Sequence, residues 1–189
     1  MVPSKLELLA AWLPQQDWYR DRPGGPELTR AGGFRLDDPA GEVGIELIVV
    51  LDEPENSSEA TAYLVPLTYR GSALPGAGDA LVGVAEHGVL GQRWIYDGTR
   101  DPVLLAALAE LIAGRVQAQA QRVSDTPDPT VLSSPAALAA GERAELVFAR
   151  VLTHADSEAP GPGQVTGMWT GSDGTDVRSV FVTAERAQV

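Results

Sequence analysis

Hydrophobic residues alternate with other residues along two stretches in the first half of the chain. Every odd position from 43 to 51 is apolar, and the odd positions from 63 to 69 repeat the spacing. A period of two is typical of β-strands, and a polar turn at 54–58 separates the two stretches. We therefore expect an antiparallel hairpin. Pro66 favours an edge position or a bulge in its second strand, because proline cannot donate to a ladder.

Shorter patterns flank this hairpin. Residues 81–87 and 92–96 are expected to form two further short strands around Gly88 and Gly91. Upstream, residues 21–33 contain two prolines and four glycines, a composition that predicts a loop.

Leucines at helical spacing predict a short helix near the N-terminus. Ser4 and Glu7 have the spacing of a capping box, in which each side chain binds the other residue's backbone N–H. Helical spacing of apolar residues follows until Pro14, which ends the helix because it lacks the N–H that the helix needs.

A second helix is expected after Asp101, which is a good N-cap residue and precedes a proline in the first helical turn. Five aliphatic residues between 104 and 112 then form one apolar stripe. Gly114 is a candidate C-cap, although residues 116–121 could prolong the helix.

The last third of the chain predicts three strands, at 143–152, 164–170 and 177–182. The dipeptide Asp173-Gly174 indicates a tight turn between the last two. We interpret the three as a β-meander that either extends the first sheet or forms a small second layer. With the helices, the pattern predicts an α+β fold.

Composition narrows the possible functions. The chain has 189 residues and a formal net charge of -12. Proteins that bind nucleic acids or anionic membranes need a basic face, so we expect neither as a partner. The chain has no cysteine, which excludes disulfides, thiol nucleophiles and thiolate metal sites, and its two histidines leave little material for zinc. We expect no metal or other cofactor. With no signal-peptide pattern and no apolar stretch of membrane-spanning length, a cytoplasmic location is expected.

The most distinctive stretch runs from Val82 to Pro102. It contains Glu86-His87, Val89-Leu90-Gly91, Arg93-Trp94-Ile95-Tyr96-Asp97 and Asp101-Pro102. It resembles the N-terminal cap domain of actinobacterial maltokinases, in the form of a free-standing cap-like protein. Residues 62–67, Trp12-Leu13 and Trp18-Tyr19 extend the resemblance, which covers roughly residues 6 to 115.

This resemblance implies a curved antiparallel β-sheet packed against one or two main helices, and a link to maltose, trehalose or α-glucan (glycogen) metabolism. It does not imply kinase activity, because the chain has one lysine, Lys5, and no motif for ATP binding or phosphoryl transfer. We expect a cap-like region at 1–122, a Pro/Ala-rich crossing segment at 123–142, and the β-meander at 143–189 within the same compact domain.

Eight residues are candidates for contact with a ligand or partner: Trp18, Tyr19, Glu86, His87, Arg93, Trp94, Tyr96 and Asp97. In a strand, Trp94 and Tyr96 share one face and form either an aromatic platform or part of the core under the second helix. Glu86 and His87 point to opposite faces, which favours an ordinary hydrogen-bonded histidine over an acid–base pair. Trp18 and Tyr19 either contribute to recognition or anchor the 21–33 loop.

Acidic residues surround the first hairpin: Asp37, Asp38, Glu42, Glu46, Asp52, Glu53, Glu55 and Glu59. A solvated face is the simpler interpretation, and a docking face for a basic partner is the alternative.

Two functions follow, and no catalytic residue is predicted. The first is a non-catalytic accessory or interaction module that binds a kinase or an α-glucan-metabolising enzyme, or a second copy of itself. The second is a binding protein for a sugar or sugar phosphate, with Trp18, Trp94 and Tyr96 lining a concave sheet face and polar groups supplied by Arg93, Glu86 and Asp97. An enzyme of another type ranks last.

Overall fold

The computed structural model describes the chain except for residues 21–23, 54–59, 122, 124, 138–142 and 188–189. Its α-helices are α1 (Lys5–Trp12) and α2 (Pro102–Ile112), and three short 3-10 helices lie at Leu13–Gln15, Gly78–Ala80 and Gly98–Arg100. Its strands are β1 (Leu28–Leu36), β2 (Gly44–Asp52), β3 (Thr61–Arg70), β4 (Leu81–His87), β5 (Gly91–Asp97), β6 (Gln119–Ala120), β7 (Leu132–Ser133), β8 (Ala144–Phe148), β9 (Gln164–Thr170) and β10 (Asp176–Arg186).

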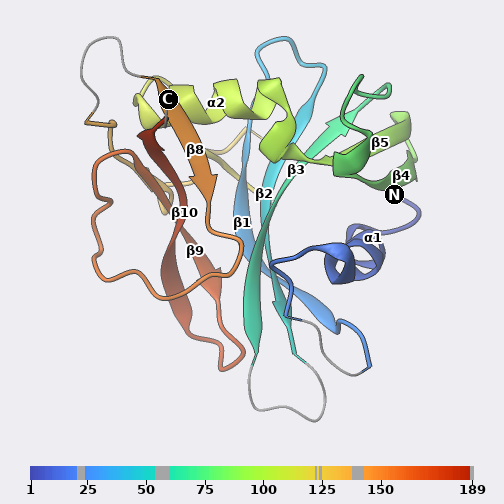
Figure 1. Ribbon diagram of the computed structural model, residues 1–189, viewed down its shortest axis with the longest axis horizontal. Coiled ribbons are helices and arrows are strands. Elements are labelled where there is room, and N and C mark those ends of the chain that lie inside the picture. The colour runs from blue at the N-terminus through green and yellow to red at the C-terminus, as the bar shows by residue number, and fades with distance from the viewer. Residues whose placement is uncertain (21–23, 54–59, 122, 124, 138–142, 188–189) are drawn as a thin grey trace.

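All of these strands belong to one antiparallel sheet with the order β4-β5-β3-β2-β1-β9-β10-β8 (Figure 1). The short strands β6 and β7 pair with β1 and β9. The predicted α+β class, with a curved antiparallel sheet against two helices, is confirmed.

The sheet curls back on itself. After β8, Val151 pairs with Tyr63 of β3, and the Leu64 amide donates to the carbonyl of Arg150 at 3.0 Å. Six neighbouring strands, in the order β3, β2, β1, β9, β10 and β8, therefore enclose an inner face. Helix α2 lies across one end of them (Figure 1).

Each face of the sheet has its own apolar core, which explains why nearly every residue of β2 and β3 is buried. On the inner face, Leu47 and its neighbours pack against Leu104 of α2. On the outer face, Ile48 packs with Leu9 of α1. Successive strand residues alternate between these two cores, as the period of two requires.

The predicted helices form for the predicted reasons. At α1, the Glu7 amide donates to the Ser4 hydroxyl, and the Ser4 amide donates to the Glu7 carboxylate, so the capping box is complete. At α2, the Asp101 carboxylate accepts from the Val103 amide at 2.9 Å.

The second helix ends where the glycine signal placed it. Gly114 has a φ of +70°, the left-handed conformation that ends many helices. Residues 116–121 do not prolong it; instead Gln119 and Ala120 form β6.

The hairpin of β2 and β3 is confirmed, with Ile48 opposite Val65. Pro66 lies within β3, immediately before Leu67, and Leu67 is the first residue of β3 that pairs with β5. The strand is internal in the sheet, yet at Pro66 no β5 residue lies opposite, so the position is locally an edge.

The loop expected at 21–33 is wrong for its second half, because Leu28 onward forms β1. Two glycines let this strand lie close to the backbone of its neighbours β9 and β2. A Cβ on Gly32 would lie 2.8 Å from the Met168 carbonyl oxygen, and one on Gly33, whose φ is +114°, would lie 2.0 Å from the Leu47 carbonyl oxygen. The register also shifts between Arg30 and Gly32, which marks a bulge.

Three C-terminal strands are present, with Gly174 of the predicted turn at a φ of +81°. Their order corrects the β-meander, because β8 pairs with β10 and not with its sequence neighbour β9. The chain after β8 crosses to β3 before it returns as β9, which separates the two strands. They extend the first sheet through the pair Gly32–Trp169. The boundaries proposed at 122 and 143 stay a prediction.

Candidate functional site

A cavity of about 560 Å³ opens on the outer face of the sheet, beside the start of α1. Lys5 and the side chains Arg35, Glu46, Tyr69, His87 and Arg93 are among its lining residues. Two of the eight predicted site residues, His87 and Arg93, therefore contribute to one cavity.

Strand register explains why these side chains meet. Arg35 of β1 lies directly opposite Glu46 of β2, and Tyr69 of β3 lies opposite Gly44. Arg93 of β5 lies opposite Ala85 of β4, with His87 two residues further along the same face. The lining thus forms an oblique row across five consecutive strands, displaced along the strand direction from β1 to β4. Gly44 gives it room, because a Cβ there would lie 3.3 Å from the Tyr69 side chain.

Glu46 is the buried centre of this row, with 2% of its surface exposed. Its Oε1 accepts from the Arg30 guanidinium and the Gln121 amide, both at 2.8 Å. Its Oε2 accepts from the Tyr69 hydroxyl at 2.7 Å and from the Lys5 ammonium. Four donors therefore satisfy one carboxylate, which is what a buried charge needs.

The electrostatics of the row follow from this network. Burial opposes ionisation of Glu46, but Lys5, the Tyr69 hydroxyl and Arg30 outweigh it and hold the pKa of the carboxyl below its ordinary value of 4.5. Burial and the neighbouring Glu46 charge raise the pKa of Tyr69 well above its ordinary value of 10.0. At neutral pH the row therefore holds an ionised glutamate and a neutral tyrosine.

His87 has a defined role as acceptor and donor. The amides of Val89 and Leu90 donate to its Nδ1 at 3.3 and 3.2 Å. A ring nitrogen that accepts carries no hydrogen, so in the neutral ring Nε2 is the donor. This agrees with the interpretation of His87 as a hydrogen-bonded histidine and leaves one donor on the ring.

The rim of the cavity is acidic and built on a loop between β1 and β2. The Asp38 carboxylate accepts from the amides of Ala40, Glu42 and Val43, each at 3.0 Å. Burial opposes ionisation of Asp38, but these bonds keep its pKa below the ordinary value. The side chains of Asp37 and Glu42 are exposed at this rim.

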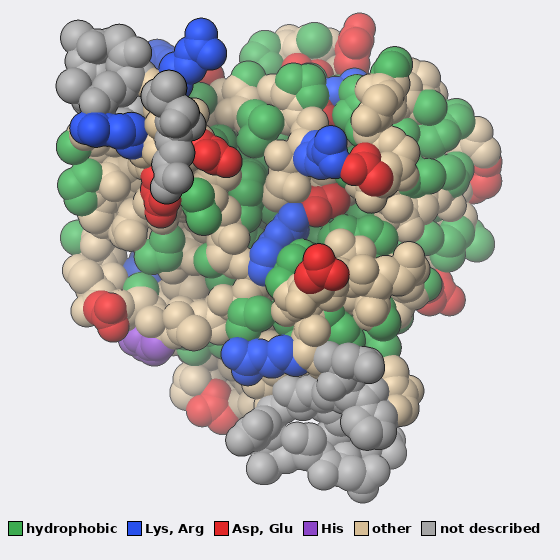
Figure 2. Space-filling model, in the orientation of Figure 1, with side chains coloured by type: hydrophobic (Ala, Val, Ile, Leu, Met, Phe, Trp, Pro, Cys, Tyr) green, Lys and Arg blue, Asp and Glu red, His purple; other side chains and the backbone are tan. Residues whose placement is uncertain are grey.

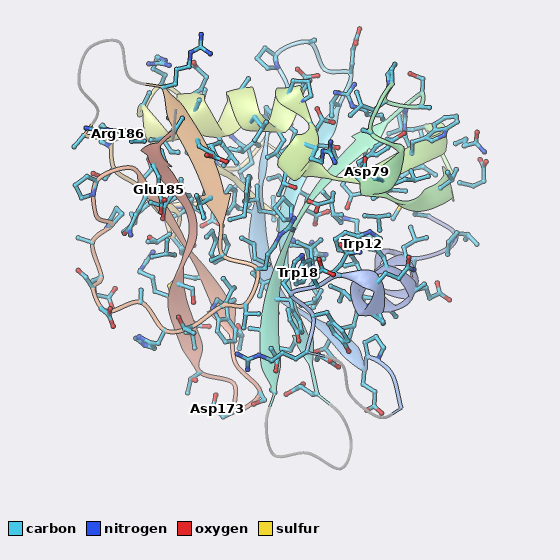
Figure 3. The ribbon with its side chains drawn as sticks, viewed as in Figure 1. Trp12, Trp18, Asp79, Asp173, Glu185 and Arg186 are labelled. Atoms are coloured by element: carbon cyan, nitrogen blue, oxygen red, sulfur yellow. The ribbon has the colours of Figure 1, made fainter. Side chains whose placement is uncertain are left out.

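The other predicted site residues lie elsewhere. Tyr19 is buried, and its hydroxyl donates to the Asp52 carboxylate at 2.8 Å. Trp18 packs beside Trp12 with ring centroids 5.8 Å apart (Figure 3), and the Arg150 guanidinium lies 4.9 Å from the Trp18 ring. Both aromatic residues therefore belong to the outer-face core.

Trp94 and Tyr96 lie on the opposite face of β5 from the cavity. They pack with Leu74, Ala77 and Ala80, and the Tyr96 hydroxyl accepts from the Leu74 amide at 2.9 Å. Their cover is the segment before β4 rather than the second helix. Since Trp18 packs on the outer face, the three aromatics expected to line one sheet face share no surface.

Asp97 and Glu86 complete the eight. Asp97 accepts from the Thr99 amide at 3.2 Å and forms an ion pair with Arg150. Glu86 is exposed, and its backbone pairs with Val2 in both directions. Neither side chain lines the cavity.

The acidic face expected around the first hairpin is wrong for Glu46 and Asp52, which are buried and hydrogen-bonded. Glu55 and Glu59 lie outside the described residues. In Figure 2, acidic and basic side chains are interspersed on the visible face.

The family comparison agrees with this geometry. Residues 12–101 match the model of the maltokinase N-terminal cap domain. This part of the chain is similar to that cap domain. No curated protein matches the chain.

The matched cap region contains strands β1 to β5, and so supplies the sheet beneath the cavity. Lys5 lies before the match, and strands β8 to β10 lie after it. Among the described residues, no group of three or more histidine, aspartate and glutamate side chains could hold a metal ion. No helix in the described part is long and apolar enough to cross a membrane.

Sequence reasoning missed Glu46, Arg35 and Tyr69 as neighbours of His87 and Arg93. A usable signal existed for Glu46. The even positions Ile48 and Val50 of its strand are apolar, so a glutamate at position 46 continues a second buried face and has to find partners there. Nothing in the sequence placed Arg35 opposite it.

Proposed function

We propose that the chain is a non-catalytic accessory module that docks on an enzyme of maltose, trehalose or α-glucan metabolism, with a maltokinase-type kinase as the first candidate. The observation that carries this proposal is the match of residues 12–101 to a domain that caps such a kinase. A cytoplasmic location is part of the proposal.

The described surface offers one apolar tip that could dock. Val2, Val89 and Leu90 are 75, 89 and 58% exposed. They belong together because Val2 pairs with Glu86, and Val89 and Leu90 form the turn that follows β4. When a partner covers exposed aliphatic side chains at the end of a sheet, the burial of apolar surface stabilises the complex.

The test is capture of a purified maltokinase by the immobilised chain, preceded by a pull-down from cells of the source organism to identify other partners. We expect a stoichiometric complex that withstands high salt, because apolar contacts are not screened. The double variant Val89→Asp/Leu90→Asp should weaken capture at least about tenfold. Val147→Asp, which alters an exposed apolar residue on β8, is the matched control and should bind as the parent does.

Three results would contradict the proposal. One is the absence of any glucan or kinase partner at low salt. Another is equal loss of capture in the tip variant and the control. The third is saturable turnover of a sugar phosphate by the purified chain alone.

A second candidate function, binding of a small ligand, is favoured by the cavity that Arg93 and His87 line. Its volume falls within the range of small-molecule sites. The aromatic face expected for this function is replaced by a polar cavity with Tyr69 as its aromatic residue. Titration with sugars and sugar phosphates, followed by tryptophan fluorescence, tests this function. A fluorescence spectrum that stays unchanged with every ligand would contradict it.

A further inference from the structure

The guanidinium groups of Arg35 and Arg93 differ from the guanidinium groups that form the ion pairs of this chain. Both side chains are half-buried, both line the cavity, and neither forms an ion pair or side-chain hydrogen bond with a described residue. In contrast, Arg30, Arg70 and Arg150 all bind a carboxylate. In a protein with a net charge of -12, two half-buried arginines without acidic partners are unusual.

From this we infer that the cavity binds a small organic oxyanion, a phosphate monoester or carboxylate that also carries hydroxyl groups, with Arg93 and His87 holding the anion. The inference rests on the ligand-binding candidate and is independent of docking.

Arg93 and His87 form the anion-binding end. They come from paired strands, and His87 is diagonal to Arg93 on one face, a spacing that long side chains can bridge. Arg93 offers a planar fork of N–H donors that fits two oxygens of one oxyanion. His87 adds its Nε2–H without having to be protonated, because two backbone amides occupy Nδ1.

Glu46 does not oppose an anion in the cavity. Lys5 and Arg30 neutralise its carboxylate, and all of its donors lie within hydrogen-bond distance. Arg35 adds a positive charge at the other end of the row, three strands from Arg93 across the sheet and four residues further along the strands, because Arg35 is in register with Asp97 through Glu46 and Leu67. The cavity wall therefore carries a positive charge at each end, Arg93 at one and Arg35 at the other.

The acidic rim restricts which anion fits. Asp37 and Glu42 are exposed carboxylates at the mouth, where a polyanion would be repelled. The same oxygens accept hydrogen bonds from hydroxyl groups. An anionic head at Arg93 and a hydroxylated body towards the rim satisfy both ends.

The test is calorimetric titration of the whole chain with three probes that share one ring: glucose 6-phosphate, glucuronate and glucose. We expect at least one anion to bind with a Kd of ~1 mM or tighter, and glucose at least about tenfold more weakly. Binding of only the phosphate or only the carboxylate assigns the headgroup, and either supports the inference.

Variants locate the site. Arg93→Ala should lower the affinity for the anion at least about tenfold, and His87→Phe should lower it about threefold. Neither variant should change the affinity for glucose. Arg115→Ala is the charge-matched control, because Arg115 pairs with Glu110 on the exposed surface. If Arg93→Ala does not fold, Arg93→Gln gives the same readout.

Equal binding of glucose and the anions would overturn the inference, as would equal loss in the Arg93 and Arg115 variants or no binding of any probe. Because this titration uses the chain alone, its failure leaves the docking result untouched. Failure to capture a kinase likewise leaves the titration untouched.

Discussion

Glu46 shows how one buried charge can be stabilised by residues that are distant in sequence. Its donors come from α1, β1, β3 and the residue after β6. A buried ion pair adds little net stability over an apolar core, but removing one partner leaves charges uncompensated. A substitution of Glu46 is therefore destabilising mainly because the remaining donors lose their acceptor.

Glu46→Gln should lower the free energy of unfolding by about 2 kcal/mol at neutral pH, since Lys5 and Arg30 lose their carboxylate but are solvated enough to limit the cost. Thermal unfolding followed by circular dichroism measures it. A loss below about 0.5 kcal/mol would contradict the importance of the network.

The pH dependence of stability provides a separate prediction. The pKa of Glu46 is lower in the folded protein than its ordinary value of 4.5, so the unfolded chain binds more protons as pH falls. The stabilisation is complete above about pH 4.5 and is lost as pH falls through the folded pKa. Unfolding midpoints between pH 6 and 3 should therefore fall less steeply in Glu46→Gln than in the parent. Parallel curves would contradict this.

Gly33 is a second residue whose identity the fold requires. Gly33→Ala should destabilise by about 3 kcal/mol or more, because the positive φ and the contact with the Leu47 carbonyl both oppose a Cβ. Gly41→Ala is a matched control: Gly41 also has a positive φ, +70°, but nothing lies near its Cβ position, so about 1 kcal/mol is expected. Equal losses in denaturant unfolding would mean that backbone conformation alone decides.

At the scale of elements, the segment after β8 ties the C-terminal strands to the cap region. Val151 pairs with Tyr63, while Arg150 binds Asp97 and covers Trp18. Each of these partners belongs to the region matched by the family model, and Arg150 does not. The ion pair is half-buried, so its removal is felt more than that of a surface pair.

Arg150→Ala should therefore destabilise by about 2 kcal/mol, through the lost ion pair and the lost contact with the Trp18 ring. The control is Arg100→Ala, whose ion pair with Asp79 is exposed on both sides and should matter by less than about 0.5 kcal/mol. Chemical denaturation measures both. A similar loss in the two variants would show that Arg150 is only a surface charge.

At the scale of the whole molecule, the cap region and the C-terminal strands share the inner core. Phe34 of β1 stacks on Phe181 of β10, with ring centroids 6.0 Å apart and both side chains fully buried. Backbone pairing between β1 and β9 is limited to one residue pair. Side-chain packing in the inner core therefore joins the two parts together with the backbone hydrogen bonds between β3 and residues 150–152.

The chain should accordingly unfold in one transition, with tryptophan fluorescence and far-ultraviolet circular dichroism coinciding. Phe181→Ala should lower the free energy of unfolding by about 3–5 kcal/mol and shift both signals together. Val147→Ala, on the exposed edge, should change it by less than about 0.5 kcal/mol. Two separated transitions would show that the C-terminal strands fold as a unit of their own.

Local signals in the sequence determined the helices and most strands. A capping box, an N-cap with a following proline, and a period of two depend only on residues a few positions apart, and each predicted element has its physical cause in the structure. The failures occurred where distant segments meet. The local sequence predicts a loop at Gly32 and Gly33, because it does not show the close approach of β9 and β2 to these residues.

The candidate site divides in the same way. Sequence alone identified Arg93 and His87 as residues of interest, and strand alternation correctly separated them from Trp94 and Glu86. Only the tertiary structure decided that Arg35, Tyr69 and Glu46 join them, because strand order and register bring side chains of five strands into one cavity. Local spacing fixes which face of a strand a side chain occupies, whereas its neighbours on that face depend on which strands pair.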